Sequence, residues 1–428
     1  MSRTAHILAQ PIMFPFSGKI AKNRFMKSAM SERLATFSTY DSDERGQPTE
    51  ELIRLYDTWS RGDIGILITG NIQIKHDHLE ATGNAIIDWD LPSDYVDEFS
   101  KLARAAKARG SLVIGQLSHP GRQVSINIQP YPESASDIEQ PPAGGVVFGR
   151  PSPLTRPAIQ DIVDRFAFSA CVLHQAGFDG VQLHAAHGFL LAQFLSRRTN
   201  QRKDEFGGTL ANRSRLLFQI IAAIRTTVND PKFIISVKLN SQDFTQDGFS
   251  ANESREIAMR LEQAGVDLIE LSGGTYELAI SSSHSAQERT PAVAREAYFL
   301  DFAEQLRPHI KRTKVAVTGG FRSAAIMAKA VDERAADIIG LGRPLTAEPL
   351  LVKELIAGEK TQAKGDKFPE GQLIRMAAAA SQIAEIGNGM DITDFDNGFN
   401  VSRFLAKLQK EMPATMSEAL SSHNSIRR

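Results

Sequence analysis

The chain has 428 residues, of which 42% are hydrophobic, and its 49 Lys and Arg residues nearly balance its 50 Asp and Glu residues. This composition is typical of a globular protein and excludes a disordered or collagen-like chain, and the net charge of -1 gives no broad attraction to nucleic acid as a partner. The single cysteine, Cys171, excludes an intrachain disulfide and a four-cysteine metal site.

Eight short runs of β-branched or apolar residues predict eight strands, at residues 24–30, 64–70, 112–118, 180–184, 233–239, 267–272, 314–318 and 337–341. Segments of helical period alternate with them, at residues 51–62, 94–109, 161–176, 213–228, 253–264, 295–306, 323–330 and 346–357. Glycines at the ends of four helices are expected in the left-handed conformation, namely Gly62, Gly110, Gly177 and Gly265. The strict alternation, with strands apolar on both faces, predicts an α/β protein of the (β/α)8 TIM-barrel class.

Two long insertions interrupt this rhythm, at residues 120–157 after the third strand and 188–212 after the fourth. Both follow the carboxyl ends of strands, where barrel active sites lie, so we expect these loops to cover the site. The barrel is expected to occupy residues 1–358, and residues 359–428 form a C-terminal extension with helical stretches at 372–386 and 401–410. Because two helices are too few for a domain, the extension should pack on the barrel or on the second subunit of a homodimer.

Glycines end the seventh and eighth strands, at Gly319-Gly320 and at Gly342-Arg343-Pro344. Bare backbone N–H groups and an arginine at these two loops form the usual barrel site for a phosphate, so we predict a phosphate-bearing ligand here rather than simple turns. The sequence has no signal-peptide pattern and no apolar stretch of about 20 residues, so we expect a cytoplasmic protein with no membrane partner.

Two histidines, His184 and His187, follow the fourth strand. Their N–H groups could converge on a substrate oxygen and stabilise an enolate that forms on hydride addition. A metal site and a structural pair are the alternatives, but neither this pair nor the group at residues 76–78 has an acidic third ligand at a recognisable spacing, so we expect no metal. Lys238, at the end of the fifth strand, is costly to bury unless it faces negative charge. Gln116 lies at the end of the third strand, where a buried glutamine is most often a hydrogen-bonded residue of the core.

Five segments together resemble the Old Yellow Enzyme family of FMN-dependent oxidoreductases. They are residues 22–30 (KNRFMKSAM), 115–123 (GQLSHPGRQ), 184–190 (HAAHGFL), 204–213 (DEFGGTLANR) and 342–344 (GRP). The resemblance implies an FMN-binding barrel that is reduced by NADPH or NADH. It further implies hydride transfer from the flavin to the activated C=C bond of a small-molecule substrate, an α,β-unsaturated carbonyl or nitro compound.

The resemblance also implies roles for single residues. Those that would bind FMN are Ala29, Met30, Ser31, Gly70, Gln116, Lys238, Gly319, Gly320, Gly342 and Arg343. Ser31 and Gly70 would lie near O4 of the flavin, and Gln116 would bind its pyrimidine edge. Lys238 would lie near N1 and O2, where charge develops on reduction. The last four would hold the phosphate, and the two histidines would bind the substrate oxygen.

The sequence departs from the family at three positions. Ser31 stands where many relatives have cysteine or threonine, and Lys238 where arginine is more common. Phe189 stands in the substrate pocket where the family's usual tyrosine donates a proton after hydride transfer, and phenylalanine cannot donate one. We expect Tyr276 to act as the substitute acid, with Tyr131 as a more distant candidate.

The missing acid leaves other functions open. A redox-neutral alkene isomerase, in which hydride is added and then returned, or a reductase of narrow scope would need no such acid. A flavin-binding protein with little turnover is a third hypothesis. A flavin-free lyase or hydrolase is a fourth, with Lys238 able to form a Schiff base.

Overall fold

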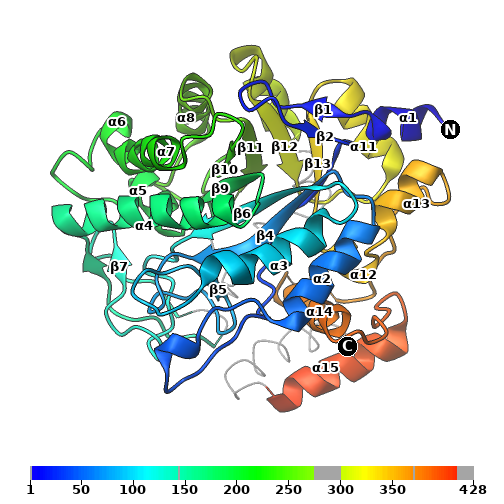
Figure 1. Ribbon diagram of the computed structural model, residues 1–428, viewed down its shortest axis with the longest axis horizontal. Coiled ribbons are helices and arrows are strands. Elements are labelled where there is room, and N and C mark those ends of the chain that lie inside the picture. Colours follow the sequence, from blue (N-terminus) through cyan, green and yellow to red (C-terminus); the bar gives the residue numbers. More distant parts are fainter. Residues whose placement is uncertain (1, 143–144, 274–299, 370–371, 412–428) are drawn as a thin grey trace.

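A computed structural model describes residues 2–142, 145–273, 300–369 and 372–411 of the chain (Figure 1). At its centre, eight parallel strands form a barrel: β3 (Phe25–Lys27), β4 (Ile66–Gln73), β6 (Leu112–Ser118), β9 (Gly180–Ala185), β10 (Ile234–Asn240), β11 (Leu268–Ser272), β12 (Lys314–Thr318) and β13 (Ile338–Leu341). Consecutive strands pair in parallel, and β13 pairs with β3 through Leu341 and Lys27, which closes the barrel. The predicted (β/α)8 barrel is therefore confirmed.

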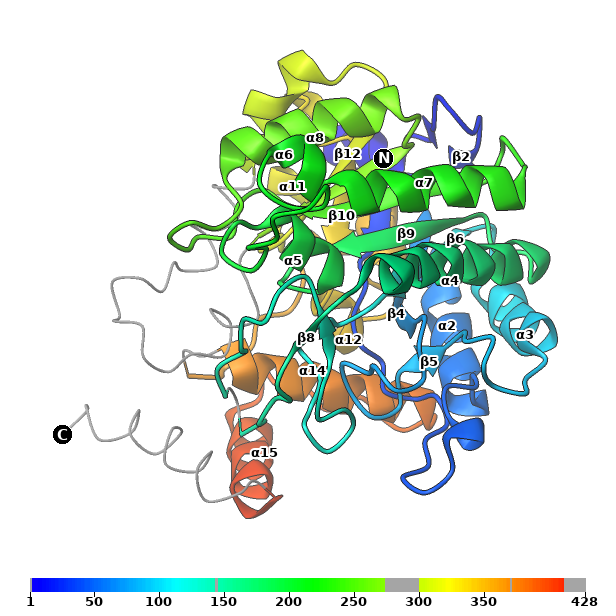
Figure 2. The same cartoon turned by 90° about the vertical axis from the view of Figure 1, so that its left-hand side faces the viewer.

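Helices surround the barrel, as the views in Figures 1 and 2 show. They are α2 (Glu50–Arg61), α3 (Tyr95–Lys107), α4 (Arg156–Gln175), α7 (Arg215–Val228), α8 (Ala251–Gln263), a helical segment at 300–306, α11 (Ala324–Asp332) and α13 (Leu351–Ala357). Helix α4 begins five residues earlier than predicted, because Thr155 accepts the N–H of Ala158 and Pro157 suits the first helical turn. The prediction of a left-handed glycine is wrong at one of the four positions. Gly62 has a φ of -74°, and the next residue, Asp63, takes the positive φ of 59°.

Several short elements have no counterpart among the predicted ones. At the amino terminus lie α1 (Arg3–Ala9) and an antiparallel pair, β1 (Ile12–Met13) with β2 (Ile20–Ala21). The others are η1 (Ser42–Glu44), β5 (Ala85–Ile86), β7 (Glu133–Ser134), β8 (Ser152–Pro153), α5 (Leu190–Leu195), α6 (Leu210–Arg213), η2 (Arg307–His309) and α12 (Pro344–Ala347). Most of these elements lie in the loops that follow strands, so they shape the carboxyl-terminal face of the barrel.

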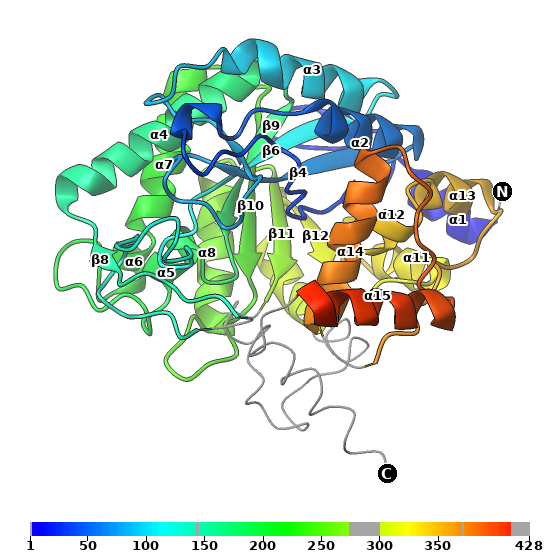
Figure 3. The ribbon, with the colours of Figure 1, turned by 90° about the horizontal axis from the view of Figure 1, so that it is seen from below.

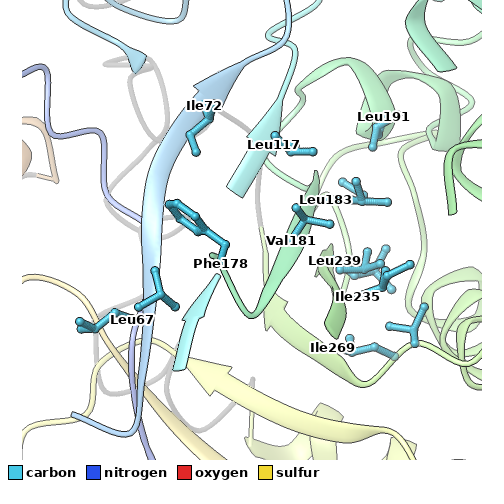
Figure 4. Packing of buried hydrophobic residues seen from close by; sticks show 14 of the residues in the cluster. Leu67, Ile72, Leu117, Phe178, Val181, Leu183, Leu191, Ile235, Leu239 and Ile269 are labelled. Atoms are coloured by element: carbon cyan, nitrogen blue, oxygen red, sulfur yellow. The ribbon is translucent and has the colours of Figure 1, made fainter. Parts of the chain in front are cut away.

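Successive side chains of each barrel strand point alternately to the outer and the inner face of the barrel, where they form two apolar layers. Side chains on the outer face pack against residues of the helices and loops in one large cluster, of which Figure 4 labels Leu67, Ile72, Leu117, Phe178, Val181, Leu183, Leu191, Ile235, Leu239 and Ile269. Side chains on the inner face form a second cluster, which includes Met26, Ile66, Ile68, Leu112, Ile114, Ile234, Leu268, Ala316 and Ile338. Ile12 and Phe14, from the β1–β2 segment, complete this inner cluster and close the amino-terminal end. The inner apolar cluster occupies only the amino-terminal half of the barrel interior, and polar side chains occupy the carboxyl-terminal half.

The two predicted insertions pack on each other at the carboxyl-terminal face. Arg202, in the loop after β9, donates hydrogen bonds to the carbonyls of Ala135 and Leu154 in the loop after β6. The guanidinium also contacts Asp204, at 2.7 Å, which holds it in place. Both loops therefore form one rim above the site.

The extension follows the last barrel helix and contains α14 (Gln372–Gly387) and α15 (Gly398–Glu411), close to the two predicted helical stretches. Figure 3 shows both helices beside the barrel, α14 near α2 and α12. Arg54 of α2 donates to the carbonyl of Gly387, and Thr346 of α12 donates to Gln382. The extension thus packs on its own barrel. In the described part of the chain, the helices are too short or too polar to cross a membrane.

Candidate active site

The two predicted histidines lie together at the end of β9, with ring centroids 5.2 Å apart. His184 is 5% exposed, and the backbone N–H of Ala186 points to its Nδ1 at 3.4 Å, which favours a proton on Nε2. Nε2 of His187 lies 2.7 Å from the hydroxyl of Ser272, at the end of β11. If Ser272 donates this bond, His187 carries its proton on Nδ1. Each ring then keeps one N–H donor, as binding of a substrate oxygen requires.

The backbone of His187 is held in an uncommon conformation, with φ of 59°. A non-glycine residue there costs about 1 kcal/mol or more, so neighbouring groups must stabilise it. Its N–H donates to Asn240 at 3.3 Å, and the side-chain amide of Gln123 donates to the carbonyls of His187 and Gly188 at 3.1 and 2.9 Å. Gln123 and Asn240 are positioning residues that we did not identify from sequence, although Gln123 ends one of the five family-like segments.

Both imidazoles are neutral at ordinary pH. Burial lowers the pKa of His184 well below its usual value, with smaller effects from His187 and Lys238. Burial, followed by the nearby charge of Lys238, lowers the pKa of His187 to about 3. Any hydrogen bond that the pair donates therefore comes from a neutral N–H group and not from an imidazolium.

Phe189 lies directly against this pair, and its ring stacks on His184 at 4.3 Å with an angle of 28° between the planes. The ring is buried, at 5% exposed, and carries no hydroxyl of its own. Tyr276, the expected substitute acid, lies outside the described residues. Tyr131 is 66% exposed on the outer loop, and the hydroxyl of Tyr56 is buried and donates to Glu32.

A layer of polar side chains crosses the barrel interior below the histidines. Its members, from β3, β6, β9, β10, β11 and β12, are Ser28, Gln116, Gln182, Lys238, Glu270 and Thr318. Nζ of Lys238 lies 3.1 Å from Glu270, whose carboxylate also accepts hydrogen bonds from Gln182 at 2.9 Å and Thr318 at 2.8 Å. Gln116 donates to Gln182 at 2.7 Å, so the amide is hydrogen-bonded within the layer.

Glu270 is not among the site residues predicted from sequence, and the structure makes it the centre of this layer. It is fully buried and pairs with the lysine that we expected to face a ligand charge. A usable signal existed, since a carboxylate in the middle of a barrel strand needs a partner on the same face. Its cationic partner, two residues from the end of the neighbouring strand, could only be found with the strand register.

Ser31 and Gly70, which we expected near O4 of a flavin, each donate a hydrogen bond to another residue of the chain. The Ser31 hydroxyl donates to Glu80 at 2.8 Å, and the N–H of Gly70 donates to Glu32 at 2.6 Å. Glu32 in turn pairs at 3.5 Å with Lys27, which is fully buried on the outer face of β3 and whose pKa burial lowers to about 8. These contacts weaken the assignment of both residues as donors to O4; Ser31 lies in the loop after β3, and Gly70 lies within β4.

The predicted phosphate-binding residues come together at the ends of β12 and β13. Gly319 and Gly320 have φ of 149° and 73°, conformations that suit only glycine. A Cβ on Gly342 would be in ordinary van der Waals contact with the sulfur of Met30, at 3.6 Å, so the glycine backbone lies next to a residue expected to line the flavin. Glycine backbone, Arg343 and the polar layer below therefore form a donor set that fits FMN.

The described residues contain one group of potential metal ligands, His78, His119 and Glu133. The N–H of Glu133 donates to Nε2 of His78, and the N–H of Gly121 donates to Nδ1 of His119. The remaining ring nitrogens contact Asp77 and Glu133. Because each imidazole lone pair accepts a backbone N–H, this group is arranged as a hydrogen-bonded cluster and not as a set of metal ligands.

Comparison with known proteins agrees with this geometry. Residues 8–362 match the model of the NADH:flavin oxidoreductase / NADH oxidase family. The chain is 41% identical over 397 residues to the NADH-dependent flavin oxidoreductase nadA of Aspergillus parasiticus, covering 91% of this chain and 88% of that protein. It is 35% identical over 366 residues to the NADH-dependent flavin oxidoreductase iccE of Talaromyces variabilis, covering 82% and 86%.

The fold is similar to that of solved structures as well. The old yellow enzyme homologue from Zymomonas mobilis superposes with a TM-score of 0.67 at 23% identity, over 84% of this chain and 94% of that one. At that identity the likeness concerns the fold alone, and the family assignment depends on the sequence matches. The chain therefore belongs to the NADH:flavin oxidoreductase family, the Old Yellow Enzyme family, and is an oxidoreductase that uses FMN with NADH or NADPH as reductant.

Proposed function

We propose that this oxidoreductase reduces the activated C=C bond of α,β-unsaturated carbonyl or nitro compounds. The observation that carries the proposal is the pair of neutral imidazoles, the buried His184 and the half-buried His187, held beside the polar layer of the barrel. Two N–H donors on one oxygen withdraw electron density from the conjugated alkene and stabilise the enolate or nitronate that results. Bound FMN supplies the hydride, after reduction by NADH or NADPH.

The cofactor would be held by the residues that meet at the carboxyl ends of the strands. These are Ala29, Met30, Ser31, Gly70, Gln116, Lys238, Gly319, Gly320, Gly342 and Arg343. The Lys238–Glu270 pair supports a modified role for the lysine, because Glu270 already balances its charge. Lys238 would then act as a hydrogen-bond donor to the pyrimidine more than as an unpaired cation. Residues 1–358 would bind the flavin, and residues 359–428 would be an accessory unit.

The test is an anaerobic reaction of the purified protein with NADH or NADPH, followed by cyclohexenone, with absorbance followed at the flavin band. We expect the band to bleach and then to return with formation of saturated ketone. The proposal is wrong if reduced protein is reoxidised no faster by enones than by buffer. A His184→Ala, His187→Ala double variant serves as the control: it should still bleach with the nicotinamide but recover slowly.

A second candidate is a redox-neutral alkene isomerase, favoured by one observation, the stacking of Phe189 on His184 where an acid is expected. Without a positioned acid, the enolate can return the hydride instead of accepting a proton. A Phe189→Tyr variant separates the two candidates. A reductase with another acid, such as Tyr276, should gain little, whereas an isomerase should gain about 10²-fold or more in saturated product.

A further inference from the structure

A cavity lies between the barrel and the C-terminal extension, next to the loops after β12 and β13. The cavity is small and open to solvent. Arg322 and Arg343 line it from the barrel side, and Lys364 and Arg375 line it from the extension. Arg343 is the residue assigned above to the phosphate of FMN, so the cavity adjoins that end of the cofactor site.

The charges around this cavity are unequal. The four basic side chains face two acidic ones, Asp366 and Asp394. Asp366 contacts Arg375 at 2.9 Å and Arg322 at 3.6 Å, and Asp394 contacts Lys364 at 3.1 Å. Basic side chains therefore outnumber acidic ones in the lining of the cavity, which favours an anionic ligand such as a phosphate monoester.

Hydrogen bonds join the barrel side of the cavity to the extension side. The N–H of Ala324 donates to the carbonyl of Thr361 at 2.9 Å, close to a backbone bridge between Ser323 and Gln362. The N–H of Lys364 donates to Glu348, just after α12, at 2.6 Å. Lys364 is thus held at a set position opposite the barrel loops, even though its side chain is 48% exposed.

An interface between the barrel and the extension that served packing alone would be filled by apolar side chains. Such a cluster exists directly beside the cavity, formed by Phe368, Ile374, Ala378, Phe395 and Val401. Phe368, Ala378 and Phe395 of this cluster also line the cavity, whereas basic groups line it from both the barrel and the extension. The side chains of Arg322, Lys364 and Arg375 are partly exposed, and basic groups on both walls create a positive potential that favours an anion among them.

We propose that the C-terminal extension is part of the cofactor site, and that Lys364 adds positive charge to the phosphate of FMN from the side opposite the barrel glycines. The ligand recognised is a phosphate monoester, and the flavin ring takes no part in this contact. The inference rests on the cofactor site proposed above and adds to it a role for the extension. It requires that Lys364 discriminate between flavins with and without a phosphate.

The experiment compares FMN with riboflavin, which has the same ring system and no phosphate. Full-length protein stripped of flavin is titrated with each, and binding is followed by quenching of flavin fluorescence. In Lys364→Met we expect the Kd of FMN to rise about fivefold, as for loss of one charge-assisted contact at a half-exposed site, with the Kd of riboflavin unchanged. Thermal unfolding of each variant checks that the fold is retained.

Asp394→Asn is the matched control, because it breaks the same ion pair but keeps the charge of Lys364. It should bind FMN as tightly as the wild type or more tightly. The inference is overturned if Lys364→Met leaves the Kd of FMN unchanged, if it weakens both flavins equally, or if Asp394→Asn weakens FMN to the same degree. Wild-type protein that binds neither flavin would instead refute the cofactor site itself, and with it this inference.

Discussion

The hydroxyl of Ser272 lies 2.7 Å from Nε2 of His187, and this bond joins the end of β11 to the substrate-binding end of β9. If Ser272 donates this bond, Nδ1 of the ring keeps the proton and can donate it to another group. Because the backbone of His187 is already held by Gln123 and Asn240, Ser272 adds control of the ring alone. These contacts hold both the backbone and the ring of His187 in position.

Ser272→Ala should raise KM for an enone about fivefold, the value of one neutral hydrogen bond, because the ring of His187 loses its partner and can turn. Flavin reduction by NADH should keep its rate, since that step does not use the substrate oxygen. Stopped-flow measurement of the two half-reactions checks this. Ser272→Thr, which keeps the hydroxyl, should restore KM; equal slowing of both half-reactions would show a general structural effect.

The low pKa of His187 predicts how stability depends on pH. The folded-state value of about 3 lies below the ordinary value of 6.5, so between these values the unfolded chain binds a proton that the folded chain does not. The free energy of unfolding contributed by this residue is therefore fully present above pH 6.5 and falls as the pH drops toward 3. Urea denaturation from pH 4 to 8 should show a shallower dependence in His187→Asn. The exposed His309→Asn is the control and should change nothing.

Lys238→Met should destabilise the protein by about 3–5 kcal/mol, because it leaves the buried carboxylate of Glu270 without its cation. The double variant with Glu270→Gln should recover most of this loss, since no buried charge remains. Chemical denaturation of the three proteins gives the comparison. If the double variant is no more stable than the single one, the two residues do not act as a pair.

The effect of Lys238 on the flavin is separable from its effect on stability. In the double variant, the midpoint potential of bound FMN should return close to the wild-type value, because the removed pair has no net charge. In the single variant, the unpaired carboxylate should lower the potential, since negative charge opposes reduction. Spectroelectrochemical titration measures both values. A potential equally low in both variants would mean that Lys238 acts on the flavin as an unbalanced cation.

Gly70→Ala should destabilise the fold by about 1–3 kcal/mol. A Cβ there would lie 1.9 Å from Oε2 of Glu32 and 2.3 Å from the carbonyl oxygen of Met30, and the backbone oxygen cannot move away alone. Thermal unfolding measures the loss. Gly398→Ala, at the first turn of α15 where nothing lies within 4 Å of the added carbon, should be neutral. Comparable losses in the two variants would contradict the steric explanation.

Much of the fold could be predicted from the sequence because its signals are local. The eight apolar runs became the eight barrel strands, since an inward and an outward apolar layer require strands apolar on both faces. The two helical stretches of the extension were predicted within about three residues of α14 and α15. Strand β3 is shorter than its apolar run, and the β1–β2 segment was missed, since neither a strand end nor a two-residue strand has a pattern of its own.

The sequence by itself determined the fold class, the family and the residue types at the strand ends, because these depend on periodicity and on motifs of contiguous residues. Only the tertiary structure decided which of those residues are partners. It paired Lys238 with Glu270, 32 positions apart, and Ser272 with His187, 85 positions apart. It also brought Lys364 opposite Arg343 across the cavity. Such pairs depend on strand register and on how the extension packs, and both are set by burial of side chains distant in sequence.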